Sequence, residues 1–98
     1  MNTLEIRTID PLGTVCVPKQ FRTKLGWDSG LRLTSLVSEL KATISLAPHP
    51  QGELEIDPLG RVKLTKASRA ILGWNEQDEI KMSVKNGALL MWQFEEPA

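Results

Sequence analysis

The chain contains 98 residues, of which 41% are hydrophobic, and its twelve basic and twelve acidic residues give a formal net charge of zero. Zero net charge argues against a protein that is basic all over and coats nucleic acid, and no apolar run approaches the roughly 18 residues that suggest a membrane span. The only cysteine, Cys16, excludes an internal disulfide and a cysteine-based zinc cluster, and we expect it to be a small residue within a sheet.

The first strand is predicted at Leu4–Ile9, where apolar Leu4 and Ile6 alternate with polar residues as in a half-buried strand. The next residues, Asp10–Gly13, predict a tight reversal, because Asp bonds to following amides, Pro fixes φ and Gly permits a positive φ. Thr14–Val17 alternates again, so we expect the reversal to join two antiparallel strands.

A short helix is predicted next, because Pro18 falls where the first helical turn tolerates a missing amide. Phe21 lies on its apolar side, and Gly26 supplies a left-handed stop. Lys19 and Arg22 are three residues apart and therefore share the opposite face.

Beyond the helix, Leu31–Thr34 predicts a further strand, and a hairpin turn is expected at Ser38–Glu39. The stretch Ala47–Gly52 is too rich in Pro and Gly for regular structure and is expected to be a linker. We assign His49 to this linker, because one histidine without a nucleophile or ligands at useful spacing makes a poor catalytic argument.

The second half of the chain repeats the first. The pentapeptide Ile-Asp-Pro-Leu-Gly begins at Ile9 and again at Ile56, 47 positions later. When Ile9–Trp27 is aligned with Ile56–Trp74, 11 of the 19 positions are identical. Such a match predicts two copies of one small unit.

These copies are predicted at 1–47 and 53–98, joined by the linker 48–52. In the second copy Thr65 replaces proline as the expected N-cap of the helix, and Asn86–Gly87 is typical of a two-residue hairpin turn. Its helix is expected to carry Lys66 and Arg69 on one face. Ala67 or Ser68 is expected on the apolar side with Ile71 and Leu72, and Gly73 is the expected stop. The strands of this copy are expected at Leu54–Ile56, Arg61–Leu64, Glu79–Val84 and Ala88–Trp92.

Together the copies predict an α+β fold that is mainly β, with about eight strands and two short helices. One copy of about 45 residues is marginal as a separate core, so both are expected to form one folded domain. Strands of a single copy would leave a long unpaired edge, and closure is therefore expected to need strands of the other copy. Trp27 and Trp74 are expected to be core or interface anchors, and Trp92 to pack within its strand.

Basic residues gather at the same place in both copies. The windows from Pro11 to Trp27 and from Pro58 to Trp74 contain Lys and Arg but no Asp or Glu. A Lys and Arg pair on a short helix is usually only a solvated face, but its repetition favours a function. The basic residues of the two windows are Lys19, Arg22, Lys24, Arg61, Lys63, Lys66 and Arg69.

The order of these features resembles the AbrB and SpoVT family of swapped-hairpin DNA-binding domains. An acidic residue, a Leu-Gly turn, a short strand, a Pro-opened helix with arginine and a terminal Leu-Gly recur from Arg7 to Trp27, and with substitutions from Glu55 to Trp74. The resemblance implies a swapped-hairpin β-barrel with pseudo-twofold symmetry. Such barrels usually form from two chains, so this chain is similar to a fused dimer that acts in transcription regulation.

By position, the resemblance implies DNA contacts for Arg7 before the first turn, Arg61 after the second, and Arg22 and Arg69 on the helices. To these we add Lys19, Lys63 and Lys66 on charge and facing alone, and we expect the two cationic helices to lie side by side on one surface. DNA affinity rests mainly on Lys and Arg that neutralise phosphates, and roughly six such contacts would give a log-log salt slope near −5.

The chain departs from the family at four arginine positions. It has Thr14 after the first turn, Glu55 before the second turn, and Thr23 and Ala70 on the helices. Each change removes a contact, so a half-site preference is expected rather than recognition of a symmetric palindrome, and weakened or lost DNA binding stays open.

Double-stranded DNA is the expected partner. The expected location is the cytoplasm, because the first residues lack the basic start and following apolar stretch of a secretory signal. The alternative is a non-enzymatic protein-interaction or scaffolding barrel. Some members of the family are antitoxins with a flexible toxin-blocking tail, but only Glu95–Ala98 follow the last expected strand. An enzyme is not expected, because Asp10 and Asp57 serve turns without a catalytic constellation. No metal, cofactor or membrane partner is expected, whereas further self-association stays open.

Overall fold

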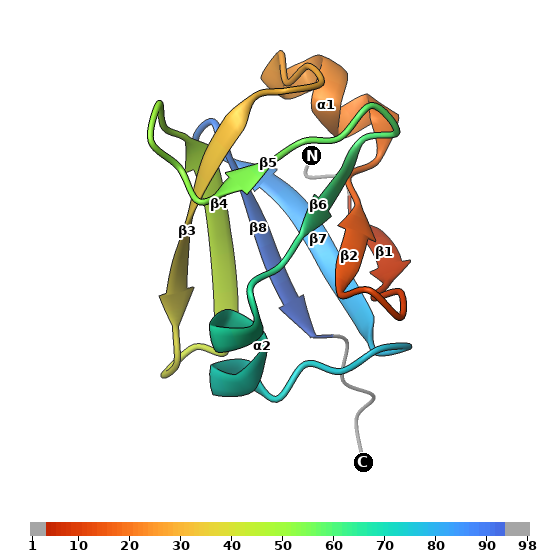
Figure 1. Cartoon of the computed structure of the whole chain (residues 1–98), viewed down its shortest axis with the longest axis vertical. Helices are drawn as coiled ribbons and strands as arrows, with labels where there is room; N and C mark the ends of the chain where they lie inside the picture. The colour runs from red at the N-terminus through yellow and green to blue at the C-terminus, as the bar shows by residue number, and fades with distance from the viewer. Residues whose placement is uncertain (1–3, 94–98) are drawn as a thin grey trace.

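The computed structural model describes residues 4–93, and the expected chain end at Glu95–Ala98 lies outside this range. Within it the fold is mainly β with two short helices (Figure 1). The strands are β1 (Glu5–Thr8), β2 (Thr14–Cys16), β3 (Arg32–Ser38), β4 (Thr43–Pro48), β5 (Leu54–Glu55), β6 (Arg61–Lys63), β7 (Glu79–Lys85) and β8 (Ala88–Gln93), and the helices are α1 (Lys19–Leu25) and α2 (Lys66–Leu72).

Six strands form one curled half-barrel sheet in the order β1-β7-β8-β4-β3-β5, and β2 pairs with β6 in a separate two-stranded ribbon. The ribbon lies between the two edge strands of the sheet, since β2 contacts β1 and β6 contacts β5. No helix in the described part of the chain is long and apolar enough to cross a membrane.

The expected local pairing of the first two strands is wrong. The reversal itself forms, with the Asp10 amide 3.0 Å from the Thr14 carbonyl oxygen and the Gly13 amide 2.9 Å from that of Asp10. However, β1 pairs antiparallel with β7, and β2 pairs antiparallel with β6. The turn sends its two strands into different sheets, so each of them finds a partner only in the other half of the chain.

The pairings between the halves are reciprocal in register. Thr8 of β1 lies opposite Glu79 of β7, and Glu55 of β5 lies opposite Arg32 of β3. Glu55 and Glu79 follow Thr8 and Arg32 by 47 positions. In the ribbon, Val15 lies opposite Val62, which is again 47 positions away. The two pairings therefore share one register, although β1 pairs with β7 over four residues and β5 pairs with β3 over two.

The core lies between the curled sheet and the ribbon. Trp27 and Trp74 are 3% and 1% exposed, which confirms that they are core residues. Val15 and Val62 are buried beneath the ribbon, and Ile44 is buried beneath β4. Residues from both halves thus contribute to one cluster, as expected for halves too small to bury separate cores.

The inward side of β1 differs from the expectation. Leu4 and Ile6 are 50% and 40% exposed, whereas Ile9, just beyond the strand, is fully buried. Ile9 continues the pairing after β1 ends, since its amide donates to the Asp78 carbonyl oxygen at 3.1 Å. The inward positions are therefore odd-numbered, and the apolar residues at 4 and 6 lie on the outer face.

The second half shows the same phase. Leu54 and Ile56 are buried, and they follow Arg7 and Ile9 by 47 positions. The residue that matches Arg7 is therefore Leu54, and Glu55, which was aligned with it from the motif alone, matches Thr8. Arg7 stands at an inward position at the edge of the sheet, where its side chain is half-buried.

The two hairpins turn differently. Asn86 and Gly87 form the expected two-residue turn, with φ of 52° and 78°, between the paired residues Lys85 and Ala88. The turn expected at Ser38–Glu39 is wrong, because Ser38 still pairs with Thr43 and leaves a four-residue connection at 39–42. Strand β4 likewise continues through Pro48, so the linker starts later than its composition predicts.

Both helices begin and end as expected. The Thr65 hydroxyl oxygen accepts a hydrogen bond from the Ser68 amide at 3.0 Å, while Pro18 precedes α1 without a side-chain cap. Gly26 and Gly73 end the helices with φ of 70° and 71°. Ile71, which was expected on the apolar side of α2, is instead half exposed, because the helix buries little beyond Ser68.

The assignment of odd-numbered positions of β1 to the core predicts that two isoleucine substitutions will reduce stability by different amounts. Ile9→Ala should lower the free energy of unfolding by about 2–5 kcal/mol, because it leaves a cavity in the core. Ile6→Ala should change it by about 0.5 kcal/mol or less, because the side chain lies on the outer face. Urea unfolding followed by circular dichroism measures both values, and equal costs would contradict the assigned phase.

Candidate nucleic-acid interface

The ribbon β2–β6 presents its polar residues away from the core. Val15 and Val62 point inward, so their neighbours along each strand point outward. Across the ribbon Cys16 lies opposite Arg61, and Thr14 lies opposite Lys63. The outer face therefore carries two cations, both on β6, while the matching positions on β2 are the neutral Thr14 and Cys16.

A carboxylate holds the turn that precedes each ribbon strand. Asp57 Oδ1 accepts hydrogen bonds from the amides of Leu59 at 2.9 Å and Arg61 at 2.8 Å, and its Oδ2 lies 2.8 Å from Arg61 Nε. Asp10 Oδ1 accepts from the Leu12 and Thr14 amides, both at 2.9 Å, and its Oδ2 accepts from the Thr14 hydroxyl. This confirms the capping role expected for both aspartates.

These bonds favour the charged form of each carboxyl group. The Thr14 hydroxyl, followed by the Thr14 amide, lowers the pKa of Asp10 below its ordinary value of 3.8. The Arg61 amide is the main cause that lowers the pKa of Asp57. Arg61 is thus oriented by Asp57, although the ion pair is exposed and contributes little stability.

Each helix arginine lies against the glycine turn of the other half. A Cβ atom on Gly60 would stand 2.5 Å from the Cζ atom of Arg22, and one on Gly13 would stand 2.8 Å from the Cζ atom of Arg69. Glycine is therefore needed at both positions for close approach as well as for φ values of 79° and 81°. The two guanidinium groups fill the space that side chains at these turns would occupy.

Backbone hydrogen bonds join the halves at the same two points. The Val17 amide donates to the Gly60 carbonyl oxygen at 2.9 Å, and the Leu64 amide donates to that of Gly13 at 3.0 Å. The arginines differ in one respect: Arg22 Nε donates to the Val17 carbonyl oxygen at 3.0 Å. Within residues 4–93, the buried Nε of Arg69 has no hydrogen-bond partner.

The lysines of the helices are exposed. Lys19 and Lys66 stand at the first positions of α1 and α2, next to the points where the halves join. Beside α2 is a hollow of about 440 Å³ lined by Lys66, Arg69, Ala70, Gly73, Trp74 and Asn75, without an acidic residue. Such a hollow suits an anionic group such as a phosphate.

The structure thus gathers six of the seven predicted site residues along the ribbon and its ends. Arg22 packs against Gly60, which precedes Arg61 in the chain. Arg69 packs against Gly13, which precedes Thr14, and Thr14 lies opposite Lys63. Arg7 is not among them, because it belongs to β1 of the six-stranded sheet, where its guanidinium group binds Glu5 Oε1 at 3.2 Å and the Ile6 carbonyl oxygen at 2.8 Å.

The helices do not lie side by side, contrary to the expectation. Figure 1 shows α1 and α2 at opposite ends of the molecule with the ribbon β2–β6 between them. Acidic residues also come closer than the sequence windows suggest, because Glu53 and Glu55 share a hollow with Lys63 and Lys66. The ribbon, rather than a pair of adjacent helices, is therefore the centre of the basic surface.

The role of the two glycines as packing sites for arginine was missed from the sequence. Gly60 and Arg22 are 38 positions apart, and no local pattern connects them. One signal was present, because both the glycines and the arginines are identical between the copies. Among the residues identical in both copies, these glycines and arginines are ones that join the halves.

Comparison of the chain with protein-family models, with curated proteins and with solved structures found no match. The family resemblance therefore rests on the sequence motifs. Any function must be argued from the residues and geometry described above.

Glycine substitutions test the packing of the arginines. Gly60→Ala should lower the free energy of unfolding by about 1–3 kcal/mol more than Gly26→Ala, because both have a positive φ but only Gly60 meets a guanidinium group. Adding Arg22→Ala to Gly60→Ala should remove much of that difference. Denaturant unfolding of the single and double variants measures the coupling, and strictly additive costs would show that the contact is unimportant.

The turn carboxylates predict a loss of stability in acid. Because the pKa values of Asp10 and Asp57 are lowered by folding, their stabilisation is present above 3.8 and is lost as the pH falls through the lower folded-state values. In Asp10→Asn with Asp57→Asn, stability should fall less steeply over this range. Some dependence of stability on pH should remain in this variant, because the Ser35 hydroxyl lowers the pKa of Glu53 as well. Denaturant unfolding at a series of pH values tests this, and an unchanged slope would contradict it.

Proposed function

We propose that this chain is a DNA-binding transcriptional regulator of the AbrB and SpoVT type, in which two copies of one unit form a fused swapped-hairpin dimer. The reciprocal pairing of β1 with β7 and of β5 with β3 supports the exchange of strands between copies. The pairing of Val15 with Val62 supports a pseudo-twofold axis through the ribbon.

The observation that carries the proposal is the basic surface of the ribbon. Arg61 and Lys63 point outward from β6, and each end of the ribbon receives an arginine from a helix. A two-stranded ribbon is narrow enough to enter the major groove of duplex DNA. Its outward cations would lie against the phosphates that border the groove.

The burial of the basic residues assigns them two roles. Lys19, Arg61, Lys63 and Lys66 are exposed and are the proposed phosphate contacts. Arg22 and Arg69 are half-buried against the glycine turns, and their proposed role is to fix the turns that present the ribbon. Four phosphate contacts correspond to a log-log salt slope of about −3.6, smaller than the slope expected if the arginines also bind phosphate.

The proposed surface is unequal about the ribbon axis. Arg61 matches Thr14, and Lys63 matches Cys16, so both cations of the outer face belong to the second half. One half of a DNA site would therefore be held more strongly than the other. This supports a preference for a half-site over a symmetric palindrome.

Arg61→Gln with Lys63→Gln tests the proposal. Both side chains are exposed, so the fold should persist, while DNA affinity should fall for all sequences and the salt slope should decrease in magnitude by about 1.8. Fluorescence anisotropy with a labelled duplex of mixed sequence, at several salt concentrations, measures affinity and slope.

Lys85→Gln is a single-charge control, because this exposed lysine belongs to β7 of the other sheet. It removes one charge and should leave the affinity nearly unchanged. If the unmodified protein shows no salt-dependent binding, the DNA proposal fails and the scaffolding alternative is favoured. If binding persists unchanged in the double variant, the ribbon is not the site.

A further inference from the structure

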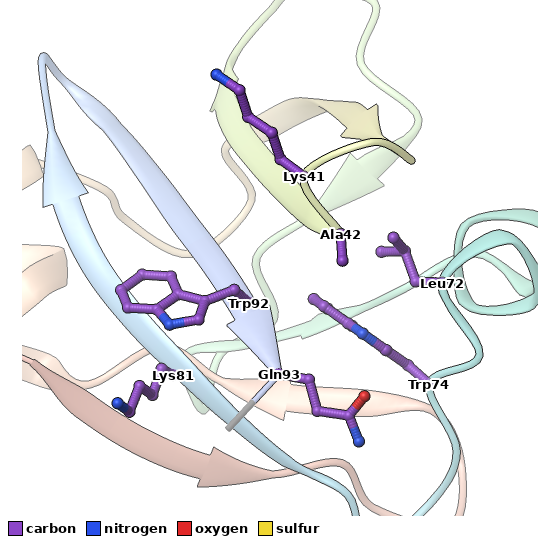
Figure 2. Close-up of a pocket in the computed structure, with 7 residues that line it drawn as sticks. All are labelled: Lys41, Ala42, Leu72, Trp74, Lys81, Trp92 and Gln93. Atoms are coloured by element: carbon purple, nitrogen blue, oxygen red, sulfur yellow. The ribbon is translucent and has the colours of Figure 1, made fainter. Parts of the chain in front are cut away.

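A hollow of about 420 Å³ lies where the loop between β3 and β4, the end of α2 and the hairpin of β7 and β8 meet (Figure 2). The loop between β3 and β4 provides Lys41 and Ala42, and the end of α2 with the following residue provides Leu72 and Trp74. Strands β7 and β8 complete it. A volume of this size lies within the range of pockets that hold small molecules.

Polar atoms form the larger part of the exposed wall, and aromatic and aliphatic groups form the rest. Figure 2 shows the Ala42 methyl group and the Leu72 side chain beside the ring of Trp74, with Trp92 across the end of β8. Trp74 is almost fully buried and therefore fixed in place. Trp92 is half-buried and lies between Thr43 and Lys81 in the register of the sheet. Two indole rings thus border one opening.

The longer of the two hairpin connections builds this opening. The loop at 39–42 has four residues, whereas the other hairpin turns within Asn86 and Gly87. Ala42 has a φ of 55°, which a residue with a Cβ atom adopts at a cost, and this conformation accompanies a methyl group directed at the hollow. The two-residue turn offers no equivalent of Lys41 and Ala42.

The charge around the hollow has one sign. Its charged lining residues are Lys41 and Lys81, and Gln93 adds an amide that can donate or accept. Lys41 is exposed, and Figure 2 shows its side chain extended away from Trp92. Its flexible stem must turn inward to meet an anion, and at this loop position that rotation costs only side-chain entropy.

We propose that this hollow binds a flat aromatic molecule that carries a carboxylate, with its ring against Trp92 and its carboxylate toward Lys41. Stacking on an indole face suits a planar ring, and the ammonium group of Lys41 favours an anion over a neutral or cationic analogue. The proposal concerns binding alone and does not depend on whether the ribbon binds DNA.

The experiment uses indole-3-acetate as the probe, with indole and acetate as its neutral and ring-free counterparts. Titration of the 15N-labelled protein, followed by amide and indole N–H resonances, should give saturable shifts at Trp92, Trp74 and Ala42. The expected dissociation constant is about 1 mM for a ligand of this size. Indole should bind more weakly, and acetate should not produce the same shifts.

Two variants examine the two halves of the ligand. Trp92→Leu should weaken the binding of indole-3-acetate by about three- to tenfold through the lost ring contact. Lys41→Gln should weaken it by about two- to fivefold while leaving indole unchanged. Lys24→Gln, an exposed lysine of α1 outside the hollow, is the control and should have no effect.

Saturable shifts confined to the hollow, with both variants weaker, would support the proposal. It is overturned if no saturable binding occurs up to about 10 mM, or if the shifts map elsewhere. Unchanged affinity in Lys41→Gln, a loop variant that does not disturb the core, would overturn the charge selection even if Trp92→Leu fails to fold.

Discussion

The whole structure depends on one constraint, which is that the first strand of each half finds its backbone partner only in the other half. The Asp-Pro-Leu-Gly turn directs β1 and β2 into different sheets, so neither can satisfy the other's amides and carbonyls. Unpaired backbone groups are costly when they are buried, and the exchange of strands between halves satisfies them. Neither half can therefore keep this fold alone, because separation would leave β1, β2, β5 and β6 without their partners and would open the common core.

The same exchange positions the basic surface. Val17 and Leu64 bond to the glycine turns of the opposite half, and Arg22 and Arg69 follow them into the same contacts. A guanidinium group that fills the space over a glycine is held by packing, and Arg22 is held also by its hydrogen bond to the Val17 carbonyl oxygen, so these groups fix the direction in which the ribbon leaves the turn. The outward positions of β6 are thereby set by residues of both halves. In this arrangement the arginines that a charge pattern assigns to ligand binding also serve the interface between the halves.

The features that sequence could predict are those determined by a few adjacent residues. The left-handed stop at Gly26, the Asn86–Gly87 turn and the aspartate-bonded reversals each follow from local conformational preference. The partner of β1 could not be predicted from its own residues, because an alternating pattern specifies a strand and not its neighbour. The same pattern also predicted the wrong buried face of β1. Leu4 and Ile6 alternate as buried residues do, but they lie on the outer face, and the buried residue is Ile9 just beyond the strand. For the proposed site, the charges were visible in the sequence, but their burial against the other half was not.

Fusion of both halves in one chain gives a freedom that a dimer of identical chains lacks, because a substitution in one half is not copied into the other. The positions that remain identical include Val15 and Val62 at the centre of the ribbon, and the arginines and glycines that join the halves. The outward ribbon positions differ, with Thr14 and Cys16 in one half where the other has Arg61 and Lys63. The two kinds of position follow different physical demands, since a change at the interface disturbs both halves and a change on the outer face disturbs neither. The interface residues therefore stay similar in the two halves while the outer surface differs. Any partner of the ribbon meets two cations, Arg61 and Lys63, that both belong to the second half.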